Sequence, residues 1–179
     1  FAFNALMVMA ENAKIQNCLY RKDVIDAMFR QVGDSTTIPY KPHVIPGVIS
    51  ASDYDLGRYG KAYMDTDIAD YHVTTGTNTA WNSGSNYRND GVDISTTSDP
   101  DPASNGYYVG WTADNEWLQY TTMVDSTAAY NVRFRYANIN AASKIRLLVN
   151  DADVSGSVSL PATGGYYSWS VFTINDVIL

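Results

Sequence analysis

The chain has 179 residues, 45% of them hydrophobic, so it can form one domain of ordinary size together with an additional segment. Its formal charge is −7 and its 12 basic residues form no cluster, which argues against binding to the phosphate backbone of a nucleic acid. Charged residues make up only 17% of the chain while tyrosine contributes 14 residues, a composition typical of a β-domain with a polar surface. With this net charge, a neutral or weakly charged ligand is the easier fit.

The first 33 residues predict two helices. The apolar residues of the first, within residues 1–16, are Phe3, Leu6, Met7 and Met9, and those of the second are Val24, Ile25, Met28, Phe29 and Val32. Gly33 then suits the position just after a helix end. Because two helices cannot form a core of useful size, we expect residues 1–33 to be the C-terminal helices of an upstream domain. The alternative is that they pack on the β-domain that follows.

Residues 34–46 predict a linker, because the sequence "DSTTIPYKPHVIP" contains three prolines and has no periodicity. Residues 47–179 then show the alternation of strands. One strand is predicted to begin near Trp117, and further alternating apolar residues are Tyr130, Val132, Phe134 and Tyr136, then Ile145, Leu147 and Val149, then Tyr167, Trp169 and Val171. The last three are expected to face inward, with Tyr166 on the opposite face at the start of that strand.

Turn residues separate these strands. "NDAD" at residues 150–153 predicts a turn, and residues 157–160 predict a short strand. No helical pattern lies between the strands. The sequence therefore predicts an all-β fold, an antiparallel β-sandwich of jelly-roll type, preceded by a short α-helical segment.

The acidic residues do not predict a catalytic pair. Asp114 and Glu116 lie two residues apart, and Asp90 and Asp93 three apart, which is the nearest approach to the paired carboxylates of glycoside cleavage. Acidic residues in polar loops are explained more simply by turn formation and solvated charge.

Other chemistry is equally poorly supported. The single cysteine, Cys18, cannot form an internal disulfide, and neither His43 nor His72 has a partner at the spacing of a zinc site or a nucleophile. No glycine-rich phosphate loop is present, and no apolar run reaches the roughly 20 residues that cross a bilayer. We therefore predict no catalytic residue in this chain, and neither a nucleic-acid nor a membrane partner.

Two aromatic residues lie where a strand cannot bury them. Trp111 precedes the polar stretch "TADNE", and Tyr166 directly follows Gly164 and Gly165. An exposed ring can cover the apolar C–H face of a sugar, while neighbouring polar groups bind the hydroxyls. Both residues are candidates for a ligand site, although core packing is the commoner role of any single aromatic residue.

From about Ile45 to Leu179 the chain resembles a family 6 carbohydrate-binding module. The blocks that carry the resemblance occur in the order and spacing of that family and are "IPGVISASDYD", "YMDTDIADY", "YRNDGVDI", "YVGWTADNEWLQYT", "YNVRFRYAN" and "LPATGGYYSWSVFT". The resemblance implies a non-catalytic, secreted β-sandwich that binds a polysaccharide or its chain ends and is attached to a glycoside hydrolase. Residues 1–33 would then be the C-terminal end of such a hydrolase.

The resemblance also implies site residues. The aromatic residue after "VG" is Trp111, and the one after "TGG" is Tyr166, where the family more often has tryptophan; together they would clamp a sugar. The family's cleft also uses an asparagine in a final strand, which we expect to lie beyond Leu179, so the sandwich in residues 47–179 is expected to be C-terminally incomplete.

A structural calcium is common in the family but less expected here. Its acidic ligands lie in an "IEAE" pattern that reads Ile49-Ser50-Ala51-Ser52 in this chain, and serine hydroxyls are weaker calcium ligands than carboxylates. We therefore expect this site to be weakened or absent and assign no metal ligand, although Asp53 or backbone carbonyls could take over.

Two functions remain open at this stage. The first is a module that targets an attached glycoside hydrolase to its polysaccharide; the second is a structural accessory domain of a hydrolase with no glycan binding of its own. Xylan, β-glucan, agar and mannan all present ring faces, so the sequence leaves the glycan open.

Overall fold

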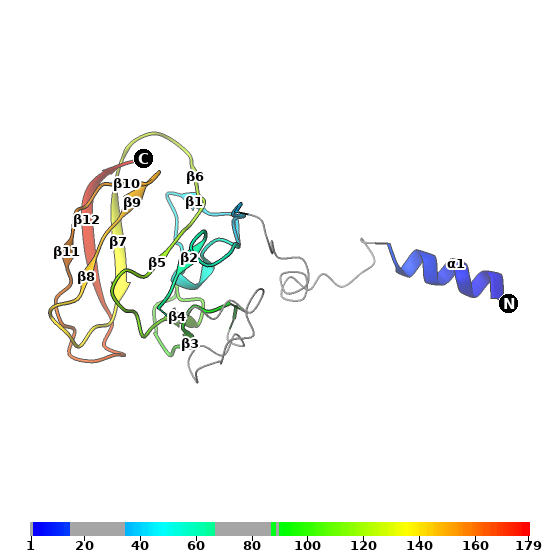
Figure 1. The fold of residues 1–179 in the computed structure, drawn as a ribbon, viewed down its shortest axis with the longest axis horizontal. Helices are drawn as coiled ribbons and strands as arrows, with labels where there is room; N and C mark the ends of the chain where they lie inside the picture. The colour runs from blue at the N-terminus through cyan, green and yellow to red at the C-terminus, as the bar shows by residue number, and fades with distance from the viewer. Residues whose placement is uncertain (1, 15–34, 67–86, 89) are drawn as a thin grey trace.

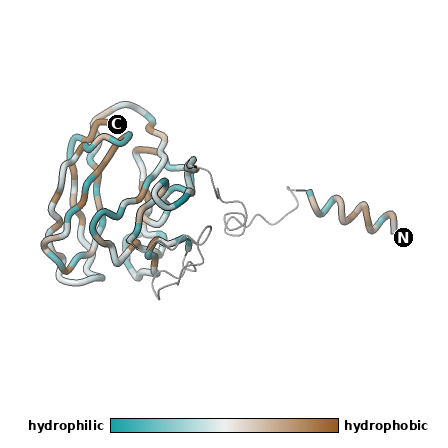
Figure 2. The backbone as a smooth tube through the Cα atoms, viewed as in Figure 1, coloured by the Kyte–Doolittle hydropathy of each residue, from teal (hydrophilic) through white to brown (hydrophobic). Residues whose placement is uncertain are grey.

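A computed structural model describes residues 2–14, 35–66, 87–88 and 90–179. The first predicted helix is confirmed as α1 (Ala2–Asn12), which is largely apolar (Figures 1 and 2). The second predicted helix, Cys18 and His72 lie outside the described residues. In the described parts of the chain no helix is long and apolar enough to cross a membrane.

After α1, the regular secondary structure of the described residues consists of strands and one 3₁₀ turn, η2 (Ala51–Asp53), as expected for an all-β domain (Figure 1). The strands are β1 (Val44–Ile45), β2 (Tyr63–Met64), β3 (Ile94–Thr96), β4 (Tyr107–Val109), β5 (Trp117–Leu118), β6 (Met123–Val124), β7 (Ala129–Tyr136), β8 (Lys144–Ile145), β9 (Leu148–Val149), β10 (Ala152–Asp153), β11 (Val158–Ser159) and β12 (Ser170–Ile178). Within the described residues they form six two-stranded pairs. In Figure 1, β7 to β12 gather on one side of the domain and β1 to β4 on the other.

The longest pair joins β7 and β12 in antiparallel register, with Phe134 opposite Phe172. Along β7, residues alternate strictly between exposed and half-buried, and the half-buried set is the predicted one. The register shifts between Ile174 and Val177, where Asp176 adopts a positive φ of 57°. This irregularity allows Val177 to be buried near the end of β12.

Short hairpins complete this side of the domain. Asn150 and Asp151 have φ values of 49° and 64°, which suit a two-residue turn between β9 and β10 and confirm the predicted turn. Strand β11, also predicted, pairs with β8 through Val158 and Ile145.

Residues of the predicted linker pair with the domain. Ile38 forms an antiparallel bridge with Leu56, and β1 lies parallel to β6, with Val44 opposite Met123. The 34–46 segment therefore has part of its backbone hydrogen-bonded to the β-domain, and its residues from Ile38 onward help to position η2.

The core lies between η2, β2 and β3. Its buried apolar members are Tyr54, Ala62, Tyr63, Val92 and Ile94. Around them lie half-buried aromatic and aliphatic residues from four other segments, among them Tyr107 and Val109 of β4. The core thus packs against one face of β4, and the other face is available for the candidate site.

Candidate functional site

Strand β4 presents two adjacent tyrosines to opposite sides. Tyr107 packs against the core and lies 4.6 Å from Tyr87, measured between ring centroids. Tyr108 points the other way because successive side chains alternate across a strand. Three further aromatic residues surround Tyr108, so β4 connects the core to an aromatic cluster.

The aromatic cluster consists of Tyr108, Trp111, Tyr167 and Trp169. The Trp111 ring is nearly parallel to that of Tyr108, with centroids 6.0 Å apart and planes at 24°. Tyr167 and Trp169 meet the Tyr108 ring edge to face, at 6.2 Å and 6.1 Å. Tyr108 therefore joins the segment after β4 to the segment before β12, which are more than fifty residues apart in the sequence.

Gly110 is required for this arrangement. A Cβ atom at this position would lie 2.6 Å from Cε2 of Tyr108, closer than carbon atoms can approach. The glycine leaves room for one edge of the Tyr108 ring beside the backbone at residue 110, next to Trp111.

Trp111 is a displayed ring. It is 51% exposed and adopts a φ of 50°, a left-handed conformation that is unusual for a bulky residue. Both features agree with the prediction that Trp111 lies in a loop rather than on a strand face. Such conformations persist where the surrounding contacts determine them, and they are often associated with ligand sites.

Glu116 braces the Trp111 loop. Its Oε2 accepts a hydrogen bond from the Ala113 backbone N–H at 2.8 Å. Its Oε1 accepts from the backbone N–H of Thr66 at 3.0 Å and from the Thr66 hydroxyl at 2.9 Å. One carboxylate thus closes the loop on itself and ties it to Thr66, two residues after the end of β2.

Tyr166 lies in a turn and is 70% exposed. The Ser168 N–H donates to the Gly165 carbonyl at 3.3 Å, so Tyr166 and Tyr167 are the two central residues of the turn. Both side chains consequently project to solvent, and Tyr167 is 66% exposed.

The prediction that Tyr167, Trp169 and Val171 all face inward at the start of the last strand is therefore wrong. Strand β12 begins at Ser170, three residues later than the alternation predicted, because the chain is still turning at Tyr167. Val171 is exposed as well, and only Trp169 of the three predicted inward residues is half-buried. The glycine pair before the turn was the signal that a strand could not yet begin.

The Tyr108 phenol is linked to the Tyr167 phenol. Burial raises the pKa of Tyr108, and its hydrogen bond with the Tyr167 hydroxyl raises this pKa further, while a hydrogen bond with Ser95 lowers it. Tyr108 thus remains a neutral hydroxyl at any physiological pH, a group suited to hydrogen bonding with another hydroxyl.

Ser52 and Asp53, which lie where the family resemblance places a calcium site, form hydrogen bonds and an ion pair with other residues. The Ser52 hydroxyl is buried and accepts a hydrogen bond from Asn105 Nδ2 at 2.8 Å. Asp53, considered as a replacement ligand, forms an ion pair with Lys41 and accepts a hydrogen bond from the Tyr87 hydroxyl. Among the described residues, no three His, Cys, Asp or Glu side chains are grouped so as to hold a metal ion. That the family's calcium site is weakened or absent here stays a prediction.

Asp90 and Asp93 are both buried, so their interpretation as solvated residues of a polar loop is wrong. Asp90 accepts from Arg88 Nη2 at 3.2 Å and from the Tyr54 hydroxyl. A buried guanidinium satisfies the carboxylate that the sequence alone assigns to a solvated turn. The pair Asp114 and Glu116 differs: Asp114 is exposed as expected, while Glu116 braces the loop.

Comparison with known families identifies the domain. The model of the carbohydrate binding module (family 6) matches residues 83–177, more than half of the chain. The matched stretch contains both β4 and the 165–168 turn, and therefore the whole aromatic cluster. No curated protein matches the chain.

Proposed function

The chain belongs to the family 6 carbohydrate-binding modules, and on that premise we propose that it binds a neutral polysaccharide, or the ends of its chains, between the rings of Trp111 and Tyr166. The observation that carries the proposal is the display of Trp111: a large ring, half exposed, in a left-handed turn that a carboxylate and a glycine both support. A sugar ring offers an apolar C–H face that such a ring can cover.

The preference for a neutral glycan follows from charge. Residues 106–118 and 161–170, which carry the aromatic rings, contain no Lys, Arg or His, but they include Asp114 and Glu116. An anionic glycan would approach carboxylates without a cation to pair with, in a chain of formal charge −7. Sugars with only hydroxyl groups avoid this repulsion.

In the whole protein we propose that the module targets an attached, secreted glycoside hydrolase to its substrate. Tethering raises the effective concentration of the catalytic domain at the polysaccharide without any new contact in its active site. The apolar side chains of α1 support an upstream domain: Phe3 and Met9 are exposed in the described structure and would gain from burial against one.

Affinity gel electrophoresis of the 179-residue chain tests this proposal. We expect retention in gels that contain at least one of xylan, mixed-linkage β-glucan, agarose or galactomannan, and none with polygalacturonate. Trp111→Ala and Tyr166→Ala should each lose about 1–3 kcal/mol of binding free energy, the usual contribution of a stacked aromatic ring. Ile178→Ala, an equally exposed apolar residue on β12, should be retained like the parent.

Two results would contradict the proposal. A folded parent chain that migrates freely in all neutral gels would favour the alternative, a structural accessory domain. Retention that survives both ring substitutions would place the glycan site elsewhere on the domain.

A further inference from the structure

The 165–168 turn displays two rings, although the expected clamp uses only one of them. Tyr166 and Tyr167 are the central residues of this turn, and they are exposed to nearly the same extent, 70% and 66%. A tyrosine that is about two-thirds exposed at the tip of a turn buries little apolar area for its size. Contacts between the rings decide which of the two tyrosines lies on the side of Trp111.

The ring contacts answer this for Tyr167. Trp111 stacks on Tyr108, and the edge contact of Tyr167 is with the same Tyr108 ring. Trp111 and Tyr167 thus flank one ring, each about 6 Å from its centroid.

The turn is held firmly at its base. The Thr163 N–H donates to the Asn138 carbonyl at 2.6 Å, and the Thr163 hydroxyl accepts from the Asn138 N–H at 2.8 Å. The same hydroxyl lies 3.1 Å from the Gly165 carbonyl, at the first residue of the turn. A fixed base and a ring with only two side-chain torsions keep the entropy cost of ligand binding low.

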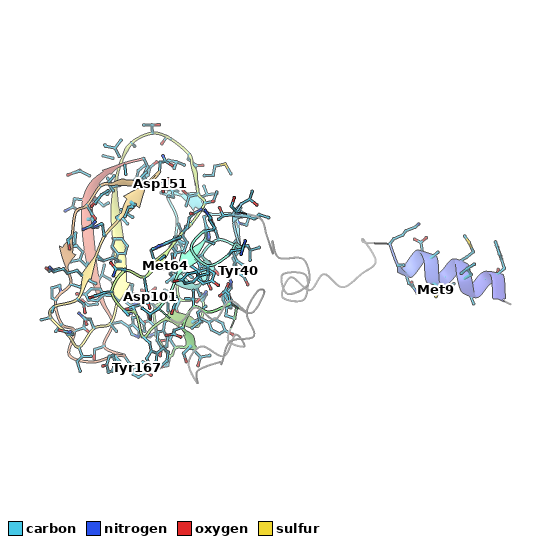
Figure 3. All side chains as sticks on the ribbon, in the orientation of Figure 1. Met9, Tyr40, Met64, Asp101, Asp151 and Tyr167 are labelled. Carbon is cyan, nitrogen blue, oxygen red and sulfur yellow. The ribbon has the colours of Figure 1, made fainter. Side chains whose placement is uncertain are left out.

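Figure 3 places Tyr167 at the end of the domain opposite the Asp151 hairpin, with its side chain among others at that end. Its neighbour Tyr108 belongs to β4, whose following loop carries Trp111. A glycan seated on Trp111 therefore has the Tyr167 ring and hydroxyl within the same cluster.

We infer that Tyr167 is a sugar-contacting residue of this site, in addition to Trp111 and Tyr166, and that its ring and hydroxyl bind the same glycan chain. The inference rests on the proposed function, since it names a further ligand contact of that site. The Tyr167 ring supplies apolar contact to a sugar face, and its hydroxyl can form a hydrogen bond with a sugar hydroxyl.

Affinity electrophoresis with substitutions at this position provides the first test. On whichever neutral polysaccharide retains the parent chain, Tyr167→Ala should weaken binding at least about fivefold, the lower end of a lost stacking contact. Tyr167→Phe keeps the ring and should lose only the smaller share that the hydroxyl contributes. Ile178→Ala changes an apolar residue that is 64% exposed at the end of β12, so it serves as the matched control and should bind normally.

Hydroxyl-radical footprinting separates direct contact from an indirect effect through Tyr108. With the retained polysaccharide present, labelling of Tyr167 should fall along with that of Trp111, whereas Met123, exposed on β6, should be labelled as before. A structural role alone would change affinity in the variants but would leave Tyr167 open to labelling in the parent complex.

The outcomes are distinct. Loss of retention in Trp111→Ala with full retention in Tyr167→Ala, or an unprotected Tyr167 beside a protected Trp111, would overturn the inference and leave the proposed function intact. A folded parent chain that no neutral polysaccharide retains would overturn both.

Discussion

Arg88 lies over the ring of Tyr54 in the core, with its guanidinium carbon 3.9 Å from the ring centroid. The same carbon lies 4.2 Å from the centroid of the Tyr40 ring, so two aromatic rings contact one positive charge. Arg88 donates to the carbonyls of Tyr54 and Asp55 and to the Asp90 carboxylate. A planar group with several fixed donors therefore fastens the η2 region to the strand that begins at Ile94.

Arg88→Lys should destabilise the domain by about 3–5 kcal/mol. A lysine keeps the charge but has neither the planar fork nor the flat surface that contacts the two rings, and Asp90 would remain buried without its full set of partners. Urea unfolding of the chain measures the loss. Arg133→Lys on the exposed face of β7 is the control and should change the free energy of unfolding by less than about 0.5 kcal/mol. Equal stability of the two variants would contradict the assigned role of Arg88.

Alkaline pH should destabilise the domain through its buried tyrosines. Burial, and then the nearby Asp90, raises the pKa of Tyr54 well above its ordinary 10.0, and burial also raises the pKa of Tyr120. Above about pH 10 the unfolded chain loses phenolic protons that the folded chain keeps, so the stability present below that pH declines as pH rises. Thermal melts from about pH 8 to about pH 11 should therefore show a falling melting temperature.

Tyr54→Phe provides the control for that pH dependence. The variant removes one raised phenol and leaves Tyr120, so its decline in melting temperature between these pH values should be smaller than that of the parent chain. A decline as steep as the parent's would mean that other groups cause the alkaline transition.

The strands with strict alternation were predictable from the sequence. The half-buried set of β7, Tyr130 to Tyr136, follows from period two alone, and the β9–β10 turn follows from Asn150 and Asp151, which tolerate positive φ. The exposure of Trp111 was predictable for the same local reason, because a residue between two strands has no sheet face on which to pack.

What the sequence could not predict depends on distant partners. Arg88 and Asp90 are a buried pair only because carbonyls of residues 52–55 supply further acceptors, and nothing local marks that. Tyr167 alternates correctly with Trp169, yet a turn closed by Ser168 and Gly165 exposes it. Periodicity records spacing along the chain and cannot say at which residue a strand begins.

Trp169→Ala should lower stability more than it lowers intrinsic affinity. Trp169 is half-buried and packs its edge on Tyr108, so removing it should cost about 3 kcal/mol of unfolding free energy. Urea unfolding and glycan titration at a temperature where the variant is folded measure the two effects separately. A stable variant that no longer binds would instead make Trp169 a ligand contact.

Removing calcium should change the melting temperature little. Ser52 is buried in a hydrogen bond with Asn105, and Asp53 is paired with Lys41, so the segment lacks free carboxylates for a calcium ion. Melting the chain with a chelator, then with excess calcium or magnesium, tests this. A marked drop that calcium restores and magnesium does not would show that other groups hold the ion.

Glu116→Ala should weaken glycan binding although Glu116 need not touch the sugar. Without this carboxylate, the Ala113 N–H and Thr66 lose their acceptor, and the loop can leave the conformation that presents Trp111. We expect a loss of about 1 kcal/mol, roughly fivefold in affinity, with a similarly small change in stability. Glu116→Gln keeps one acceptor oxygen and should recover part of the affinity, since its amide nitrogen cannot accept the second hydrogen bond. Asp114→Ala removes an exposed carboxylate from the same loop and should leave binding unchanged or slightly improved.

Trp111 would also become more accessible to acrylamide in Glu116→Ala, measured against a Trp111→Phe reference that removes its emission. If Glu116→Ala and Asp114→Ala bind alike, with equal quenching, then the loop keeps its conformation without the brace, and Gly110 with Tyr108 is sufficient to hold Trp111 in place.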